Sequence, residues 1–119
     1  MDLVYEEIKS DLKINQVVLM LHGYGADAKD FLSLANYWHR FLPNTLFVAP
    51  NAPKKCQINS AGYEWFDLVQ TDKNKTTNEL IESVDKLKIF NYYTTMKNIY
   101  TIFLILISIT NLTYKFFGR

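Results

Sequence analysis

The sequence predicts an α/β protein whose parallel sheet is built on one β-α-β unit followed by a further helix. Three features support this: an apolar run at 17–21, an amphipathic stretch at 28–41 and a second apolar run at 46–49. Runs this short are typical of strands buried on both faces of a parallel sheet. Two strands joined through a helix are expected to be parallel, with a right-handed crossover.

The composition limits the possible functions. Of 119 residues, 49% are hydrophobic and 21% are charged, as in a globular domain. A net charge of +1 provides no field that would attract nucleic acid, and no cofactor or metal is expected. Cys56 has no second cysteine to pair with and is interpreted as an ordinary loop residue rather than a reactive thiol. The acidic N-terminus lacks the apolar core of a secretory signal, so a cytoplasmic location is expected.

Apolar alternation and the positions of glycine and aspartate predict the first elements. Residues 3–14 alternate weakly and predict an edge strand or a connector. After the strand at 17–21, Gly23 and Gly25 allow backbone angles that favour a tight loop. Asp27 can then cap a helix through its carboxylate.

The next segment, 28–41, is expected to form a single helix that ends before Pro43. His39 falls on its polar side and is expected to be solvated. The apolar stripe that should face the sheet consists of Phe31, Leu34, Ala35, Trp38 and Phe41.

The later elements are less regular. Residues 50–62 are expected to be a loop, and 63–68 a short strand or a packed aromatic segment. A further helix is expected to begin at Thr77 or Asn78. Its apolar side should carry Leu80, Ile81, Val84 and Leu87.

The strand, glycine turn and helix are compatible with dinucleotide binding, because G-x-G-x-x-A at 23–28 satisfies that pattern. This alternative also requires an acidic residue after the next strand, where the sequence has Pro50 and Asn51. Asp27 would moreover lie where a pyrophosphate binds, and like charges repel. A nucleotide-binding module is therefore the less favoured interpretation.

Three segments resemble the phospholipase/carboxylesterase branch of the α/β-hydrolases, which includes acyl-protein thioesterases. They are LHGYG at 21–25, FVAPNAP at 47–53 and GYEWFDL at 62–68, in the order and at about the spacing of that family. The resemblance covers residues 17 to about 85. It implies a small acyl ester or thioester as substrate, and an oxyanion hole to which the backbone N–H of Tyr24 contributes.

The same resemblance bears on the neighbouring side chains. His22 precedes any nucleophile, whereas a triad histidine follows it, so His22 cannot be the triad base. It is expected to shape the loop with Gly23 and Gly25 by bonding nearby backbone. The resemblance places Trp65 and Phe66 close to the acyl groove, although the residues alone favour a plain core position for both.

The sequence lacks the nucleophile motif that ester hydrolysis by this fold requires. Hydrolases of this fold present serine within Gly-x-Ser-x-Gly, because only small neighbours permit the strained turn. The five serines are Ser10, Ser33, Ser60, Ser83 and Ser108, and none has glycine two residues away on both sides. The triad acid and histidine are missing as well, so this chain is expected to be catalytically inactive.

The charge pattern changes after residue 85. Residues 1–85 contain 8 basic and 12 acidic residues, whereas 86–119 contain 5 basic residues and no acidic one. We expect a partial α/β-hydrolase domain at 1–88 and an unrelated apolar, basic tail at 89–119, as in an esterase gene cut short by a frameshift. The alternative is a small binding or membrane-anchored protein that uses 99–114, which is close to the shortest membrane span. The oligomeric state is not predicted.

Overall fold

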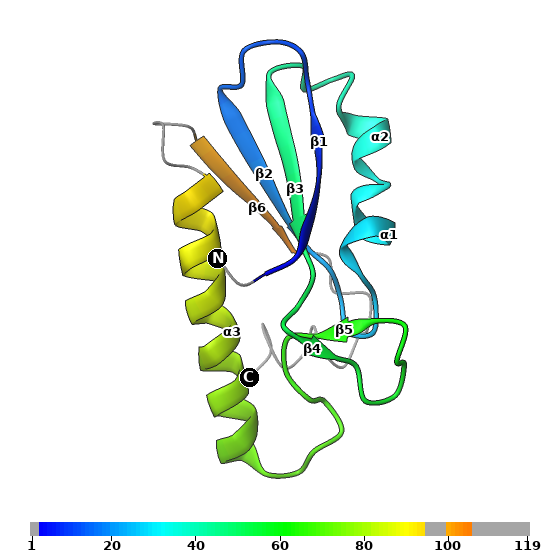
Figure 1. Cartoon of the computed structure of the whole chain (residues 1–119), viewed down its shortest axis with the longest axis vertical. Helices are drawn as coiled ribbons and strands as arrows, with labels where there is room; N and C mark the ends of the chain where they lie inside the picture. The colour runs from blue at the N-terminus through cyan, green and yellow to red at the C-terminus, as the bar shows by residue number, and fades with distance from the viewer. Residues whose placement is uncertain (1–2, 95–99, 106–119) are drawn as a thin grey trace.

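The computed structural model describes residues 3–94 and 100–105, and it has an α/β fold with helices on both faces of one main sheet (Figure 1). The sheet has the strand order β1-β3-β2-β6. Strands β3 and β6 run parallel to β2, and β1 runs antiparallel to β3 at one edge. The bounds of these strands are β1 Tyr5–Lys9, β2 Gln16–Leu21, β3 Thr45–Pro50 and β6 Tyr100–Ile105. The α/β prediction is therefore confirmed, with one antiparallel edge strand added.

The predicted β-α-β unit is present, because β2 and β3 are parallel and paired from Gln16↔Thr45 to Leu19↔Val48. The connecting helix is not continuous. It consists of α1, Ala28–Leu32, and α2, Ala35–Trp38. Ser33 ends α1, and its hydroxyl donates to the carbonyl oxygen of Asp30 at 2.6 Å, which competes with the helical ladder.

This interruption moves the end of the segment out of helical phase. Phe41 was expected to face the sheet, and that prediction is wrong: its side chain is 70% exposed. The Arg40 guanidinium lies over the Phe41 ring, 4.8 Å from the centroid. His39 is exposed, as predicted.

Strand β2 is buried on both faces, which confirms the prediction for 17–21. Val18 and Met20 pack with Phe47 and Phe31 in the cluster beneath α1 and α2. The alternate residues of β2 face the other side, where α3 covers them. That second cluster contains Val17, Leu19, Leu21, Val48 and Phe90.

Helix α3, Lys73–Thr94, begins earlier than predicted. The Asp72 carboxylate accepts hydrogen bonds from the backbone N–H groups of Asn74, at 3.0 Å, and Lys75, at 3.3 Å. This side chain therefore caps the helix one turn before Thr77.

The predicted buried face of α3 is also partly wrong. Ile81 and Val84 are 54% and 41% exposed. The side that packs against the rest of the protein carries Leu80, Ser83, Leu87 and Phe90. These positions have the helical spacing of three and four residues. The buried stripe of α3 is therefore rotated about the helix axis relative to the predicted stripe, which contained only apolar residues.

A small antiparallel hairpin lies at the end of the sheet where β2 and β3 finish (Figure 1). It consists of β4, Lys54–Lys55, and β5, Tyr63–Glu64. The expectation that 50–62 is all loop is therefore wrong, because β4 lies within it. The short strand expected in 63–68 is β5.

The predicted division after residue 88 falls inside α3, and residues 100–105 of the predicted tail form β6. The division itself stays a prediction. Most of 99–114, the candidate anchor, lies outside the described residues. Among the helices that the structure describes, none combines the length and the apolar character needed to cross a membrane.

Candidate oxyanion site at the end of strand β2

The chain leaves β2 through a type II turn formed by residues 23–26. The N–H of Ala26 donates to the carbonyl oxygen of Gly23 at 3.2 Å. Gly25 occupies the third turn position with a φ of +78°, which residues with a Cβ adopt only with strain. The loop predicted from the two glycines is thus one defined turn.

Tyr24 occupies the second position of this turn, where the backbone N–H is not used by the turn itself. Within residues 3–94 and 100–105, no acceptor bonds this N–H. The turn lies at the carboxyl end of a parallel strand, where α/β folds place their ligands. The Tyr24 N–H is therefore an available donor at the expected place.

The β4–β5 hairpin holds the turn through its backbone. The N–H of Gly25 donates to the carbonyl oxygen of Tyr63, and the N–H of Tyr63 donates to that of Ala26, both at 2.9 Å. The Asn59 side-chain amide donates to the carbonyl oxygen of Gly25, also at 2.9 Å. At Gly62 the backbones approach so closely that a Cβ would lie 2.0 Å from the Gly25 carbonyl oxygen.

His22 is buried and binds backbone on both sides of its ring. The Ala52 N–H donates to Nε2 at 2.9 Å, so the proton of the neutral ring is on Nδ1. Nδ1 lies 2.7 Å from the Gly23 carbonyl oxygen and donates to it. Burial lowers the pKa of His22, and the Gly23 carbonyl and the Asp27 charge only partly oppose this effect. The ring is thus a neutral link between the turn and the segment after β3.

The two aromatic residues predicted near the groove have different surroundings. The Trp65 indole N–H donates to the His22 carbonyl oxygen at 2.8 Å, and its ring lies 5.3 Å from the His22 ring. Phe66 instead packs with Tyr24 and Cys56, which is buried.

Phe66 also lines a cavity of about 530 Å³ beside α3. Phe66 and Leu80 provide its apolar lining. The other lining residues are polar, and they are Gln70, Thr71, Lys73, Thr76 and Thr77.

The first turn of α1 is capped by protein groups. The Asp27 carboxylate accepts from the N–H of Asp30 at 2.8 Å, and the Asn51 side-chain oxygen accepts from that of Ala28 at 2.7 Å. Two amides that a pyrophosphate would bind in the dinucleotide alternative are therefore already occupied.

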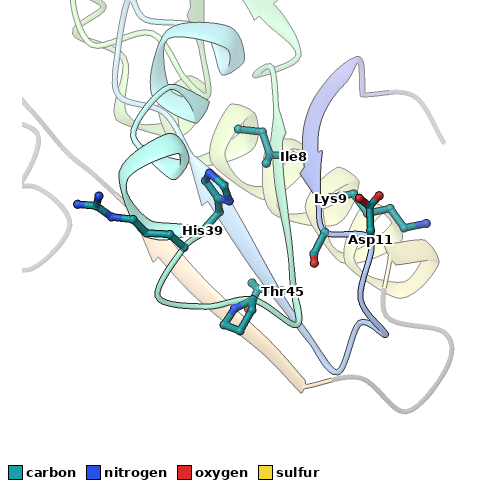
Figure 2. A pocket seen from close by; sticks show the side chains of 8 residues that line it. Ile8, Lys9, Asp11, His39 and Thr45 are labelled. Carbon is teal, nitrogen blue, oxygen red and sulfur yellow. The ribbon is translucent and has the colours of Figure 1, made fainter.

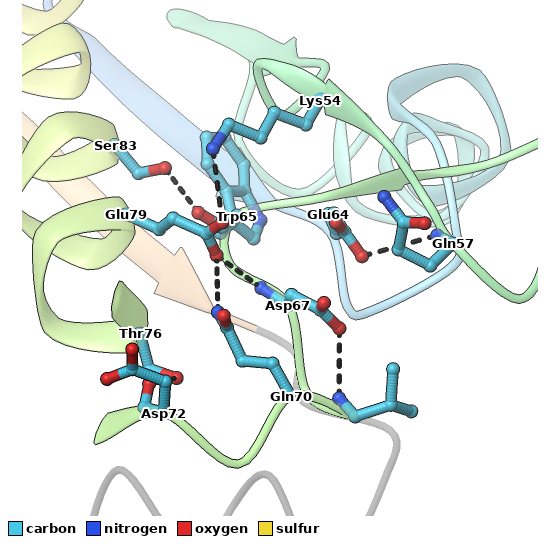
Figure 3. Close-up of polar contacts among 11 residues, drawn as sticks. Lys54, Gln57, Glu64, Trp65, Asp67, Gln70, Asp72, Thr76, Glu79 and Ser83 are labelled. Carbon is cyan, nitrogen blue, oxygen red and sulfur yellow. Dashed lines mark hydrogen bonds and ion pairs between the residues drawn. The ribbon is translucent and has the colours of Figure 1, made fainter. Parts of the chain in front are cut away.

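Helix α3 is joined to this region by the Glu79 carboxylate (Figure 3). Its Oε2 accepts from the Asp67 N–H at 2.9 Å and from the Gln70 amide at 3.0 Å. Its Oε1 lies 3.3 Å from the Lys54 ammonium. One turn further along α3, the Ser83 hydroxyl donates to the Trp65 carbonyl oxygen.

A second cavity, of about 340 Å³, lies at the opposite end of the sheet (Figure 2). Its lining includes Ile8, Lys9, Asp11, His39 and Thr45. In the described part of the chain, no three His, Cys, Asp or Glu side chains are grouped in a way that could hold a metal ion.

Comparison with known proteins agrees with this geometry. The phospholipase/carboxylesterase family model matches residues 5–96. The chain belongs to this family. Among solved structures, esterase PE8 is similar with a TM-score of 0.73 and 29% identity, over 89% of this chain and 53% of that chain. Acyl-protein thioesterase 2 of Zea mays shares the fold with a TM-score of 0.65 and 18% identity, over 87% of this chain and 46% of that chain.

Relative to these family structures, the chain spans about half of their length. The matched part contains the turn at the end of β2, the β4–β5 hairpin and α3. It therefore includes every residue that surrounds Tyr24 in the site described above.

Sequence reasoning missed several residues that hold the turn or join the segments beside it. Asn59 and Gly62 lie in the segment that composition predicts to be a loop, and the sequence predicts no tertiary contact for Glu64 or Glu79. The only available signal at Glu64 was an acid inside an aromatic segment, YEWF at 63–66. Gly62 and Asn59 contact Gly25 from another segment, and the Glu79 contacts span nine residues or more, so no local pattern indicates them.

Proposed function

We propose that this chain provides the oxyanion-binding part of a carboxylesterase- or thioesterase-type hydrolase. In this proposal the Tyr24 N–H donates to the negative oxygen that develops when an ester or thioester carbonyl is attacked. The observation that carries it is the Tyr24 N–H, which has no acceptor among the described residues and is held in a braced turn at the end of β2. The family membership supports the same reaction class.

The substrate in this proposal is a small acyl ester or thioester. The cavity beside Phe66 and Leu80 is the candidate acyl site, because its apolar wall continues from the Tyr24 side chain through Phe66. In this proposal Trp65 supports the turn rather than lining the acyl site, because its indole N–H donates to the His22 carbonyl oxygen.

We propose further that these 119 residues do not complete the covalent cycle. None of the five serines lies in Gly-x-Ser-x-Gly, and an oxyanion donor without a nucleophile cannot form an acyl-enzyme. Hydrolysis of p-nitrophenyl esters is expected to stay at background, and a fluorophosphonate probe is expected to label no serine. Labelling of one serine would contradict this part of the proposal. The cytoplasmic location and the possible membrane contact through 99–114 stay predictions.

The role of the Tyr24 N–H can be tested by binding. Octylphosphonate carries a tetrahedral anion on an alkyl chain, and so it resembles the oxyanion together with an acyl group. Tyr24→Pro removes the N–H at a turn position where proline fits, whereas Tyr24→Ala loses the same ring but keeps the N–H. A hydrogen bond to a charged group contributes about 1.5–3 kcal/mol, so Tyr24→Pro should bind roughly 10- to 100-fold more weakly than Tyr24→Ala.

The measurement is an NMR or calorimetric titration of each variant, with circular dichroism to establish that both are folded. Equal affinity of the two variants for octylphosphonate would argue against the Tyr24 N–H as the donor. Absence of saturable binding by the unaltered chain would remove the proposed site.

A further inference from the structure

The cavity that lies beside α3 is not lined by apolar side chains alone. Its volume of about 530 Å³ is within the range of small-molecule sites, and Phe66 and Leu80 form its apolar part. A purely apolar ligand cannot bond to the polar side chains that complete the lining. The hydrogen-bonding capacity left on them therefore indicates which ligand fits. They are Gln70, Thr71, Lys73, Thr76 and Thr77.

The orientation of the Gln70 side-chain amide is fixed by Glu79. Gln70 Nε2 donates to Glu79 Oε2 at 3.0 Å (Figure 3). The other Glu79 oxygen lies 3.3 Å from the Lys54 ammonium, as expected of an ionised carboxylate, which can only accept. The Asp67 backbone N–H also donates to Oε2, at 2.9 Å, and holds the carboxylate in place. The nitrogen of the Gln70 amide therefore faces Glu79, and the oxygen is left for another partner.

That oxygen has no protein partner in the part of the chain that the structure describes. Gln70 Oε1 is buried, and no donor among those residues bonds it. A buried acceptor without a donor is costly, and native structures contain few of them. Gln70 lines the cavity, and the terminal torsion of a glutamine side chain is broad. Oε1 can therefore turn toward a ligand while Nε2 keeps its bond to Glu79.

Two threonines of the cavity cannot supply the missing donor. The Thr76 hydroxyl donates to the Asp72 carbonyl oxygen at 3.2 Å, and the Thr77 hydroxyl donates to the Lys73 carbonyl oxygen at 2.9 Å. A hydroxyl has one proton, so both retain only the capacity to accept. The donor that Gln70 Oε1 lacks is therefore expected to come from the ligand.

The charge of Lys73 narrows the class of ligand. Its side chain is exposed, and no ion pair holds its ammonium among the residues described. A ligand ammonium group could donate to Gln70 Oε1, but Lys73 would repel it. A ligand carboxylate could bind Lys73, but it has no proton to donate to Oε1. A hydroxyl group both donates and accepts, and so it suits both residues.

We propose that the cavity selects acyl groups that carry a hydroxyl group, and that Gln70 determines this specificity by accepting the hydrogen bond of that hydroxyl. Glu79 acts as the positioning residue that holds the Gln70 amide, and Phe66 and Leu80 contact the alkyl part of the ligand. The substrate class is then a hydroxyacyl ester or thioester. This inference rests on the acyl role that the proposed function gives to the cavity.

The test compares two isomers that have the same atoms. In n-hexanol the hydroxyl donates and accepts, whereas methyl pentyl ether can only accept. Each is titrated into the full chain labelled with ¹⁵N and ¹³C, and the methyl signals of Thr76, Thr77 and Leu80 report occupation of the cavity. We expect n-hexanol to bind roughly 2- to 10-fold more tightly, the range for one neutral hydrogen bond. The Gln70 side-chain carbonyl carbon should shift more with n-hexanol than with the ether.

A variant pair identifies the acceptor. Gln70→Met keeps the length of the side chain but removes Oε1, so the preference for n-hexanol over the ether should disappear. A loosened cavity would change both affinities together, so their ratio separates the lost hydrogen bond from a structural effect. Gln57→Met, at an exposed position outside the cavity lining, is the matched control and should keep the preference.

Charged probes test the class of ligand. Hexylammonium and hexanoate have nearly the same alkyl chain, and each should bind more weakly than n-hexanol. Tighter binding of hexanoate would make Lys73 the determinant and would overturn the proposal. Tighter binding of hexylammonium would overturn the choice of a hydroxyl.

The proposal is also overturned if the two isomers bind equally, if Gln70→Met keeps the preference, or if neither isomer shifts the cavity signals. The comparison on the unaltered chain decides the question even if Gln70→Met fails to fold. No tetrahedral anion is used. A hydroxyl preference without any effect of Tyr24→Pro on octylphosphonate would remove the oxyanion role but keep the ligand class of the cavity.

Discussion

Two glycines are needed at the turn formed by residues 23–26, each for a different reason. Gly25 adopts a positive φ of +78°. Gly62 lies in another segment, and its hydrogen atoms face the carbonyl group of Gly25. The first glycine permits the turn, and the second permits the hairpin to approach it.

Gly62→Ala tests the second requirement. The new Cβ would lie 2.0 Å from the Gly25 carbonyl oxygen, and both sides of this contact are backbone. Overpacking of this kind costs about 1–3 kcal/mol, so the urea midpoint should fall and the Tyr24 amide resonance should move. Ser60→Ala, at an exposed position of the same loop, is the control and should change the free energy of unfolding by less than about 0.5 kcal/mol. Equal midpoints for both variants would contradict the predicted backbone clash.

The buried His22 ring is expected to make the free energy of unfolding depend on pH. Its pKa is lowered in the folded state by burial, whereas the unfolded chain has the ordinary value of 6.5. The unfolded state therefore binds more protons below pH 6.5, and the stability provided by neutral His22 is full above that pH and is lost as the pH falls.

His22→Ala removes both ring hydrogen bonds and should lower the free energy of unfolding by roughly 2–3 kcal/mol at pH 7.5. The difference from the unaltered chain should shrink below pH 6.5. His39→Ala, at an exposed position, is the control and should change the free energy of unfolding by less than about 0.5 kcal/mol. A constant difference for His22→Ala between pH 7.5 and 5 would show that the ring does not titrate in this way.

At the scale of elements, α3 is connected to the segment after β5 by the bonds of Glu79. Burial would raise the pKa of this carboxyl, but the Asp67 N–H and the Lys54 ammonium lower it overall. The charged form is therefore the bonded form. Its stabilisation is present above the ordinary glutamate value of 4.5 and is lost as the pH falls through the lowered value.

Glu79→Gln should free the start of α3. It removes the ion pair and weakens two hydrogen bonds, at a cost of about 1–3 kcal/mol. Amide hydrogen exchange should accelerate in residues 67–80 more than in β2 and β3. Glu82→Gln removes the same charge from an exposed position and should leave those rates within twofold. Uniform acceleration along the whole chain would indicate global destabilisation rather than local release.

At the scale of the whole molecule, β6 covers one edge of β2. Six residue pairs join the two strands, from Gln16↔Tyr100 to Leu21↔Ile105. Without β6, the backbone groups on that edge of β2 would be unpaired, and an open strand edge promotes association between chains.

A chain ending at Thr94 should therefore be less stable and should self-associate, whereas one ending at Ile105 retains β6. At roughly 0.5–1.5 kcal/mol per hydrogen bond, the loss should appear as a clearly lower urea midpoint. Size-exclusion chromatography with light scattering reports the association. Two monomeric chains with the same midpoint would mean that the β2–β6 pairing contributes little.

The sequence by itself determined the local order of this molecule. The apolar run at 17–21, the glycines at 23 and 25 and Asp27 predicted a strand, a turn and a capped helix, because each depends on residues within a few positions of one another. The same segments identified the family, and the structure confirmed the parallel β2–β3 pair. Apolar periodicity alone predicts one helix over 28–41. At Ser33 the side-chain hydroxyl bonds to the Asp30 carbonyl oxygen, and the expected helix is divided in two.

Only the tertiary structure decided what holds the turn. The hairpin places Gly62 and Tyr63 against Gly25, and Glu79 reaches the segment after β5 from α3. These contacts join residues that are distant in the chain, and their strength depends on burial, which no local pattern of residue types specifies. The type of turn is therefore encoded locally, whereas its rigidity and electrostatic environment arise from packing.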